Sequence, residues 1–126
     1  MPLNSSHIVQ IAIPVRDLER AKHFYGETLG LAHLFDAPPG LAFFQCGETR
    51  LMLSRPETLD QAKASILYYS VPDAQAACAA LAADGVEIAE AARCIARVGG
   101  KDIWLGIAND GEGNLLGLMS EEAPAA

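Results

Sequence analysis

The sequence lacks the features that would point to a membrane or to export. Apolar residues form 51% of the 126-residue chain, yet no run of them approaches the roughly 20 residues of a membrane-spanning helix. Residues 1–6 contain neither a basic start nor the apolar segment that directs secretion. We therefore expect a cytoplasmic protein that has no membrane partner.

Cysteine is scarce, and its spacing gives no disulfide framework. The three cysteines, Cys46, Cys78 and Cys94, are odd in number, far apart and without a CxxC pair. In a cytoplasmic protein such residues are reduced thiols that behave as small apolar side chains. No signature of a nucleophile surrounds them, which leaves a catalytic thiol as the lesser alternative.

Clustered positive charge and nucleotide-binding motifs are also missing. The net charge is −7, from 16 acidic and 9 basic residues, and the basic residues are scattered along the chain. A protein that follows a phosphate backbone needs a basic patch, so we expect no nucleic-acid partner. The chain has no P-loop, no GxGxxG and no GxSxG, and we expect no cofactor.

What is present is one pattern that occurs twice. Apolar alternation over residues 8–15 predicts a strand, and Asp17 is a good N-cap for a helix that continues to Leu29 and stops at Gly30. Three strands are expected next, at 31–35, 41–46 and 50–54. The pattern restarts with a strand at 65–71, a helix at 74–83, and strands at 86–89, 102–108 and 114–120.

The two helix starts, Asp17 and Asp73, lie 73 − 17 = 56 residues apart, which indicates an internal duplication. We predict an α+β fold with two tandem βαβββ modules, about 7–55 and about 65–121, in a single domain over 1–126. Residues 55–64 are the expected connector, and 121–126 the expected frayed tail.

Strand alternation divides each sheet into two faces, and one of them has an unusual composition. Val9, Ile11 and Ile13 are expected to face the helices, as are Leu51, Leu53, Leu67, Tyr69, Leu116 and Leu118. The opposite face carries amide, guanidinium, hydroxyl, thioether and aromatic groups. Such a mixture suits a cupped sheet around a small ligand, and a subunit interface is the alternative.

The candidate ligand contacts are Gln10, Phe44, Arg50, Met52, Tyr68 and Trp104. Arg50 has the fork geometry that binds a carboxylate or phosphate, although a solvated arginine at a strand end is an equal alternative. The face of Trp104 stays open, with core packing favoured. Asp110 and Glu112 lie in a glycine-rich turn and are expected to be structural.

The segments 11–21, 24–25, 29–31 and 109–116 closely resemble the vicinal oxygen chelate superfamily. This superfamily includes glyoxalase I, extradiol dioxygenases, methylmalonyl-CoA epimerase, and fosfomycin and bleomycin resistance proteins. The turn 109–114 is similar to the family's Asp-Pro-Asp-Gly-Asn turn, with Gly111 where proline is usual. The resemblance implies paired modules that curl around a cleft, commonly in a homodimer.

The resemblance also assigns four metal-ligand positions, which this chain fills with Gln10, Met52, Ile66 and Gly117. Divalent ions need several oxygen or imidazole donors, and only Gln10 offers one. The histidines His7, His23 and His33 follow no ligand spacing. We therefore expect no metal site.

Three functions follow from this reading, and one is favoured. The favoured one is metal-independent binding of a small aromatic or amphipathic molecule, by sequestration as in the resistance proteins of this fold. The alternative is a glyoxalase-like lyase or isomerase, or a dioxygenase-type metalloenzyme. A metal-free enzyme that polarises its substrate with Tyr68 or Arg50 is the third.

Overall fold

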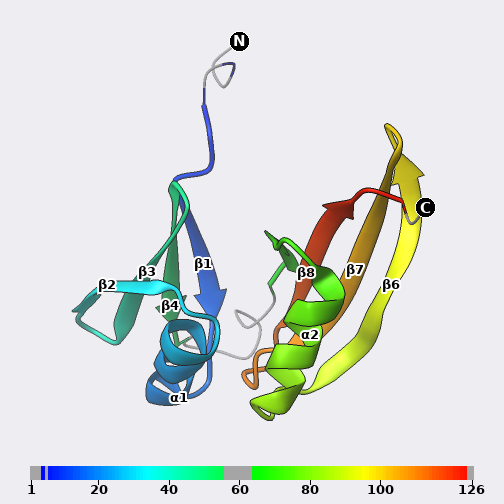
Figure 1. Cartoon of the computed structure of the whole chain (residues 1–126). Coiled ribbons are helices and arrows are strands. Elements are labelled where there is room, and N and C mark those ends of the chain that lie inside the picture. Colours follow the sequence, from blue (N-terminus) through cyan, green and yellow to red (C-terminus); the bar gives the residue numbers. More distant parts are fainter. Residues whose placement is uncertain (1–3, 5, 56–63, 125–126) are drawn as a thin grey trace. The chain divides into compact units, whose positions relative to one another are not determined.

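The computed structural model describes residues 4, 6–55 and 64–124, so most of the predicted connector lies outside the described residues. The chain divides into two compact units, Met1–Ala64 and Ser65–Ala126. Each unit has the predicted order of one strand, one helix and three strands (Figure 1). The α+β fold built from two βαβββ modules is thereby confirmed.

Unit 1 is a four-stranded mixed sheet with one helical segment. It contains β1 (Gln10–Pro14), α1 (Leu18–His23), β2 (Ala32–Ala37), β3 (Leu41–Cys46) and β4 (Thr49–Ser54). The strand order is β1-β4-β3-β2, and β1 runs parallel to β4 while the other pairs are antiparallel. The helix continues past His23 as a π-helical turn, η1 (Phe24–Thr28), in which the Leu29 amide donates to the Phe24 carbonyl at 2.8 Å.

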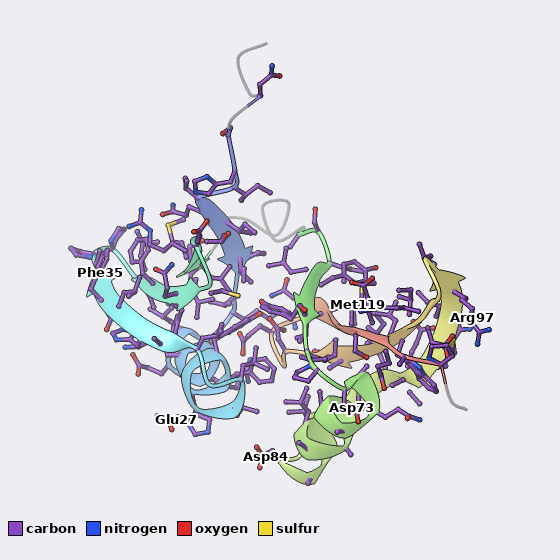
Figure 2. All side chains as sticks on the ribbon, turned by 45° about the horizontal axis from the view of Figure 1, so that its top comes forward. Glu27, Phe35, Asp73, Asp84, Arg97 and Met119 are labelled. Carbon is purple, nitrogen blue, oxygen red and sulfur yellow. The ribbon has the colours of Figure 1, made fainter. Side chains whose placement is uncertain are left out.

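Unit 2 repeats this arrangement with a longer helix and longer outer strands. It contains β5 (Leu67–Ser70), α2 (Ala74–Ala83), β6 (Ile88–Val98), β7 (Lys101–Asn109) and β8 (Leu115–Glu122), in the order β5-β8-β7-β6. Alanine is the strongest helix former, and the alanine-rich α2 runs from the cap Asp73 to Asp84, as Figure 2 shows. Gly99 and Gly100 have φ angles of +61° and +79° and form the turn from β6 to β7.

The duplication is visible in both the helix caps and the strand register. The Asp17 carboxylate accepts from the Arg20 amide at 3.0 Å, and the Asp73 carboxylate accepts from the Ala76 amide at the same distance. Ile11 pairs with Leu51 in unit 1, as Leu67 pairs with Leu116 in unit 2. Each helix therefore starts with the same cap and follows a strand that pairs in parallel with the last strand of its module.

The core of each unit lies between its helix and one face of its sheet. Leu51 is 2% exposed and Leu53 is fully buried in unit 1, and Leu116 and Leu118 are 2% and 4% exposed in unit 2. Burying one such side chain stabilises a fold by about 1.5–3 kcal/mol. The helices supply Ala21, Phe24 and Tyr25 on one unit and Ala74, Cys78 and Leu81 on the other.

Two boundaries predicted from the sequence are wrong. The strand expected at 86–89 is the much longer edge strand β6, Ile88–Val98, because its ladder to β7 continues through three register shifts. Residues 121 and 122, expected in the tail, belong to β8, since Ile103 pairs with Glu121 and Asp102 with Glu122. Backbone pairing with β7 thus orders a segment whose side chains are acidic.

Candidate functional site

The face of the unit 1 sheet turned away from α1, here called the helix-free face, carries a polar and aromatic strip. Strand pairing places Gln10 beside Arg50, and Ala12 beside Met52. It also places Met52 beside Phe43, and Phe43 beside Phe35. Residues paired in a ladder project to the same side of the sheet. The face predictions made for Gln10, Arg50 and Met52 agree with this register.

The Gln10 amide is engaged at both of its ends. Its Oε1 accepts a hydrogen bond from Arg50 Nε at 2.8 Å. Its Nε2 donates to the sulfur of Met52 at 3.8 Å. Gln10 therefore holds the guanidinium group of Arg50 in place through the strand pair β1–β4, and its only side-chain oxygen already has a cationic donor.

Two phenylalanines extend the strip from Arg50 toward the sheet edge. The Cζ atom of Arg50 lies 5.4 Å from the centroid of the Phe43 ring, within the range of a cation–π contact. The Phe43 and Phe35 rings stack with centroids 4.5 Å apart and an interplanar angle of 25°. Phe43 is 8% exposed and Phe35 is 46% exposed, so the strip ends in an accessible aromatic face on β2 (Figure 2).

The structure places Phe44 on the other side of the sheet from this strip. Phe44 pairs with Leu51, is 1% exposed, and lies so close to Gly26 that a Cβ there would meet its ring at 3.2 Å. It is a core residue, so the selection of Phe44 as a ligand contact is wrong, and its neighbour Phe43 is the phenylalanine of β3 that lies on the helix-free face. The run 41–46 is apolar except for Gln45, which lies on the same face as Phe43, and this single polar residue is the signal within the strand that could have distinguished the two phenylalanines.

The helix-free face of the unit 2 sheet is dominated by Tyr68. Tyr68 is 53% exposed as a residue, and its ring covers Gly117, with which it pairs across β5 and β8. A depression of about 590 Å³ opens beside this ring. Aliphatic side chains, a thioether and both signs of charge line it: Tyr68, Ser70, Val71, Ile103, Met119, Lys101 and Glu121, together with Pro72.

Trp104 lies on the helix side of the unit 2 sheet. It pairs with Ser120, whose hydroxyl accepts from the Ala74 amide at the start of α2 at 3.0 Å and donates to Glu122 at 2.6 Å. Trp104 is half-buried there, next to Cys94 on β6. The favoured reading of this tryptophan as a packing residue agrees with its position.

Asp110 and His33, two other polar residues considered from the sequence, have local structural roles. The Asp110 carboxylate accepts from the Glu112 and Asn114 amides at 2.7 and 3.0 Å and from the Asn114 side chain at 2.8 Å, which ties the turn before β8. His33 is bonded to the Asp36 carboxylate at 2.7 Å. The Lys22 ammonium, also 2.7 Å from Asp36, lowers the pKa of that carboxyl, with His33 as a further cause.

A comparison with models of protein families finds one match, which covers most of both modules. The family model described as Glyoxalase/Bleomycin resistance protein/Dioxygenase superfamily matches residues 7–118. The chain belongs to this superfamily. A search among curated proteins finds no match.

Solved structures of other superfamily members share the fold over almost their full length. A member from Sphaerobacter thermophilus DSM 20745 gives a TM-score of 0.74 at 21% identity and covers 92% of this chain and 98% of its own. Lactoylglutathione lyase from Agrobacterium tumefaciens gives 0.70 at 21% identity, with 91% and 93% covered. TnmS3, an antibiotic binding protein from Streptomyces sp. CB03234, gives 0.71 at 27% identity, with 94% and 98% covered.

The residues at the four metal-ligand positions of the superfamily are a poor match to a divalent ion. The Gln10 oxygen is bonded to a guanidinium group, and the Met52 sulfur is bonded to the Gln10 amide. Ile66 is a hydrocarbon, and Gly117 lies beneath the Tyr68 ring. Elsewhere in the described part of the chain, no three His, Cys, Asp or Glu side chains are grouped as a metal would require.

Among the residues that the structure describes, no helix is long and apolar enough to cross a bilayer.

Proposed function

We propose that this chain is a metal-independent member of its superfamily that binds a small aromatic or amphipathic molecule and releases it unchanged, by sequestration. The observation that carries the proposal is the 2.8 Å hydrogen bond from Arg50 Nε to Gln10 Oε1. Both side chains are exposed, so the repulsion of a second cation is moderate, but a metal would also have to displace this hydrogen bond to reach the one available oxygen. Gln10, the first of the four metal-ligand positions that the resemblance assigns, orients the guanidinium group of Arg50 instead.

The helix-free faces have the composition of a small-molecule site. Unit 1 contributes the stacked pair Phe35 and Phe43 beside Arg50, and unit 2 contributes Tyr68 and the depression next to it. Pockets for organic molecules are lined mainly by apolar and aromatic groups, with a few polar groups that fix orientation. Gln10, Arg50, Met52 and Tyr68 are therefore retained as proposed ligand contacts, with Phe43 and Phe35 added and Phe44 and Trp104 removed.

The relatives support binding more directly than catalysis. TnmS3, at 27% identity, is described as an antibiotic binding protein. The similarity to lactoylglutathione lyase, at 21% identity, concerns the fold, and the fold hosts many chemistries. We propose by resemblance that the chain is a homodimer, which light scattering over micromolar concentrations tests: a monomeric mass throughout would contradict it.

The deciding experiment measures metal content and metal-dependent stability of untagged protein. Elemental mass spectrometry is combined with melting curves with and without added Zn, Ni, Mn and Fe(II) ions. We expect neither stoichiometric metal nor a rise in Tm, whereas an ion held at 100 times its dissociation constant adds about 2.7 kcal/mol of stability. Cys94→Ser is the matched control, because Cys94 is exposed and can bind soft ions adventitiously.

The binding arm of the experiment separates a binder from a metal-free enzyme. Small aromatic and amphipathic compounds are screened by calorimetry, and each compound that binds is recovered and analysed after long incubation. Unchanged recovery is expected. Stoichiometric metal that survives in Cys94→Ser would favour lyase, isomerase or dioxygenase chemistry, and product formation without metal would favour the use of Tyr68 or Arg50 in catalysis.

A further inference from the structure

Within the part of the chain that the structure describes, Arg50 has no acidic partner, although the protein carries a net charge of −7. Its neighbours on the helix-free face of unit 1 are an amide, a thioether and aromatic rings. Among the described residues, no Asp or Glu forms an ion pair with it, whereas Arg97 has Asp102 at 2.8 Å and Lys22 has Asp36 at 2.7 Å. An arginine placed among uncharged groups in an acidic protein is suited to an anion from outside the chain.

Gln10 determines which edge of the guanidinium group is available. Because Arg50 Nε donates to Gln10 Oε1, that nitrogen is occupied within the sheet. The two terminal nitrogens form the remaining edge of the fork. Two parallel N–H donors at this spacing match the two oxygens of a carboxylate, which is the geometry of the bidentate pair.

An aromatic surface lies next to this cation. Phe43 sits on the strand between Arg50 and Phe35, and it contacts both of them. One face of the Phe35 ring is stacked on Phe43, and the residue as a whole is 46% exposed. A planar ring can therefore add to the stack at Phe35, or lie along the strip toward Arg50.

We propose that the helix-free face of unit 1 recognises a planar aromatic carboxylate, in which Arg50 binds the carboxylate and the phenylalanine pair binds the ring. This inference rests on the proposed small-molecule binding function and specifies the class of its ligand. Gln10 is a positioning residue, because it acts on the ligand through the orientation of Arg50. The face thus selects for an anion even though the overall charge of the protein repels one.

The test uses two probes of the same shape, 2-naphthoate and 2-naphthamide, titrated into the full chain by calorimetry at neutral pH. We expect wild type to bind the acid about tenfold or more tightly than the amide, since hydrogen bonds to a charged group are the stronger ones. In Arg50→Gln the two probes should bind equally. Arg97→Gln is the matched control, because it removes one exposed arginine elsewhere and should keep the preference for the acid.

Two further variants separate the carboxylate contact from the ring contact. Gln10→Glu supplies Arg50 with an internal carboxylate, so it should weaken the binding of 2-naphthoate and leave the affinity for 2-naphthamide unchanged. Phe35→Ala should weaken the binding of both probes by a similar factor of about 3 to 10. Leu34→Ala is its control, because Leu34 is a neighbouring side chain that is 42% exposed. Circular dichroism confirms that each variant is folded.

The outcomes distinguish this inference from the function on which it rests. Equal binding of both probes to wild type, or an acid preference that survives in Arg50→Gln, overturns the carboxylate assignment while leaving small-molecule binding intact. If neither probe binds, the inference is wrong, and the wider compound screen decides the proposed function independently.

Discussion

The ring of Tyr68 lies directly over the backbone of Gly117: a Cβ on Gly117 would come within 2.5 Å of its Cδ2 atom and 2.9 Å of its Cε2 atom. The equivalent pair in unit 1 is Ala12 and Met52. There the small residue is on the first strand and the long one on the fourth, and in unit 2 the sizes are exchanged. In each unit one long side chain covers the parallel strand pair, β1–β4 or β5–β8. The glycine at position 117 is therefore explained by the space that the Tyr68 ring occupies.

Gly117→Ala should displace the Tyr68 ring with a small effect on stability. Tyr68 is 53% exposed and can rotate toward solvent, so we expect a loss of about 1 kcal/mol or less, the lower end for overpacking. Urea unfolding of Gly117→Ala in the wild-type and Tyr68→Ala backgrounds measures the coupling. The loss should shrink when Tyr68 is absent; an equal loss in both backgrounds would contradict the contact.

Gly106→Ala should be considerably more harmful. A Cβ at Gly106 would collide with the Cys78 sulfur and approach the Ala92 Cα at 3.3 Å, and both lie in packed elements, α2 and β6. Overpacking of this kind costs typically about 1–3 kcal/mol. The double variant Gly106→Ala with Cys78→Ala should recover part of this loss in urea unfolding, since the sulfur is removed. A double variant no more stable than Gly106→Ala would show that Ala92 dominates.

The sequence predicted the features of the fold that depend on local chemistry. Asp17 and Asp73 each cap a helix at the positions expected, since a short carboxylate before an apolar periodic segment satisfies the first free amides. The face assignments for β1 and β4 followed from alternation because the helix side of each strand carries branched apolar residues and the other side carries Gln10 or Arg50. Local rules were sufficient where the two faces differ.

The parts that were missed depend on contacts between strands distant in sequence. β6 is an edge strand with most of its side chains exposed and three register shifts, so it has little alternation to detect. The aromatic pair Phe35–Phe43 follows from the β2–β3 register, including the shift between His33 and Phe35. Within β3 only Gln45 distinguishes the face of Phe43 from that of Phe44, and the pairing of Phe43 with Met52 on β4 makes the assignment certain.

The three cysteines should react with thiol reagents in the order of their accessibility. Cys94 is exposed, Cys46 intermediate and Cys78 buried, and burial raises the pKa of the Cys78 thiol. Because the thiolate is the reacting form, Cys78 is protected twice. Peptide mass spectrometry after timed alkylation of the native protein should find Cys94 modified first and Cys78 last. Rapid modification of Cys78 without unfolding would contradict its position on the buried side of α2, facing Gly106 of β7.

The same pKa shift gives a pH dependence whose sign can be stated. A thiol whose pKa is raised by folding contributes stability below the unfolded value, about 8.5, and loses it as the pH rises through the folded value. The stability of wild type should therefore fall more steeply above that pH than the stability of Cys78→Ala. The comparison uses urea unfolding at a series of alkaline pH values, and parallel curves would contradict the shift.

The Asp36 carboxylate joins α1 to the edge strand β2, and its contribution should disappear in acid. The hydrogen bond from Lys22 is the main cause that lowers the pKa of Asp36, followed by that from His33. A carboxyl whose pKa is lowered by folding stabilises the protein above its unfolded value, about 3.9, and this stabilisation is lost as the pH falls through the folded value. Asp36→Asn should thus lower Tm slightly at neutral pH and leave it unchanged in strong acid.

The expected change in Tm is small because the Asp36 side chain is 48% exposed, and solvent screens such pairs. Glu27→Gln is the matched control: Glu27 is an exposed acid on the π-helical turn, so its removal changes the net charge equally without breaking this link. The difference in Tm between Glu27→Gln and wild type should not change over the pH range in which Asp36 titrates. If Asp36→Asn and Glu27→Gln changed Tm by the same amount at every pH, net charge alone would account for the effect, and the link between α1 and β2 through Lys22 would contribute nothing measurable.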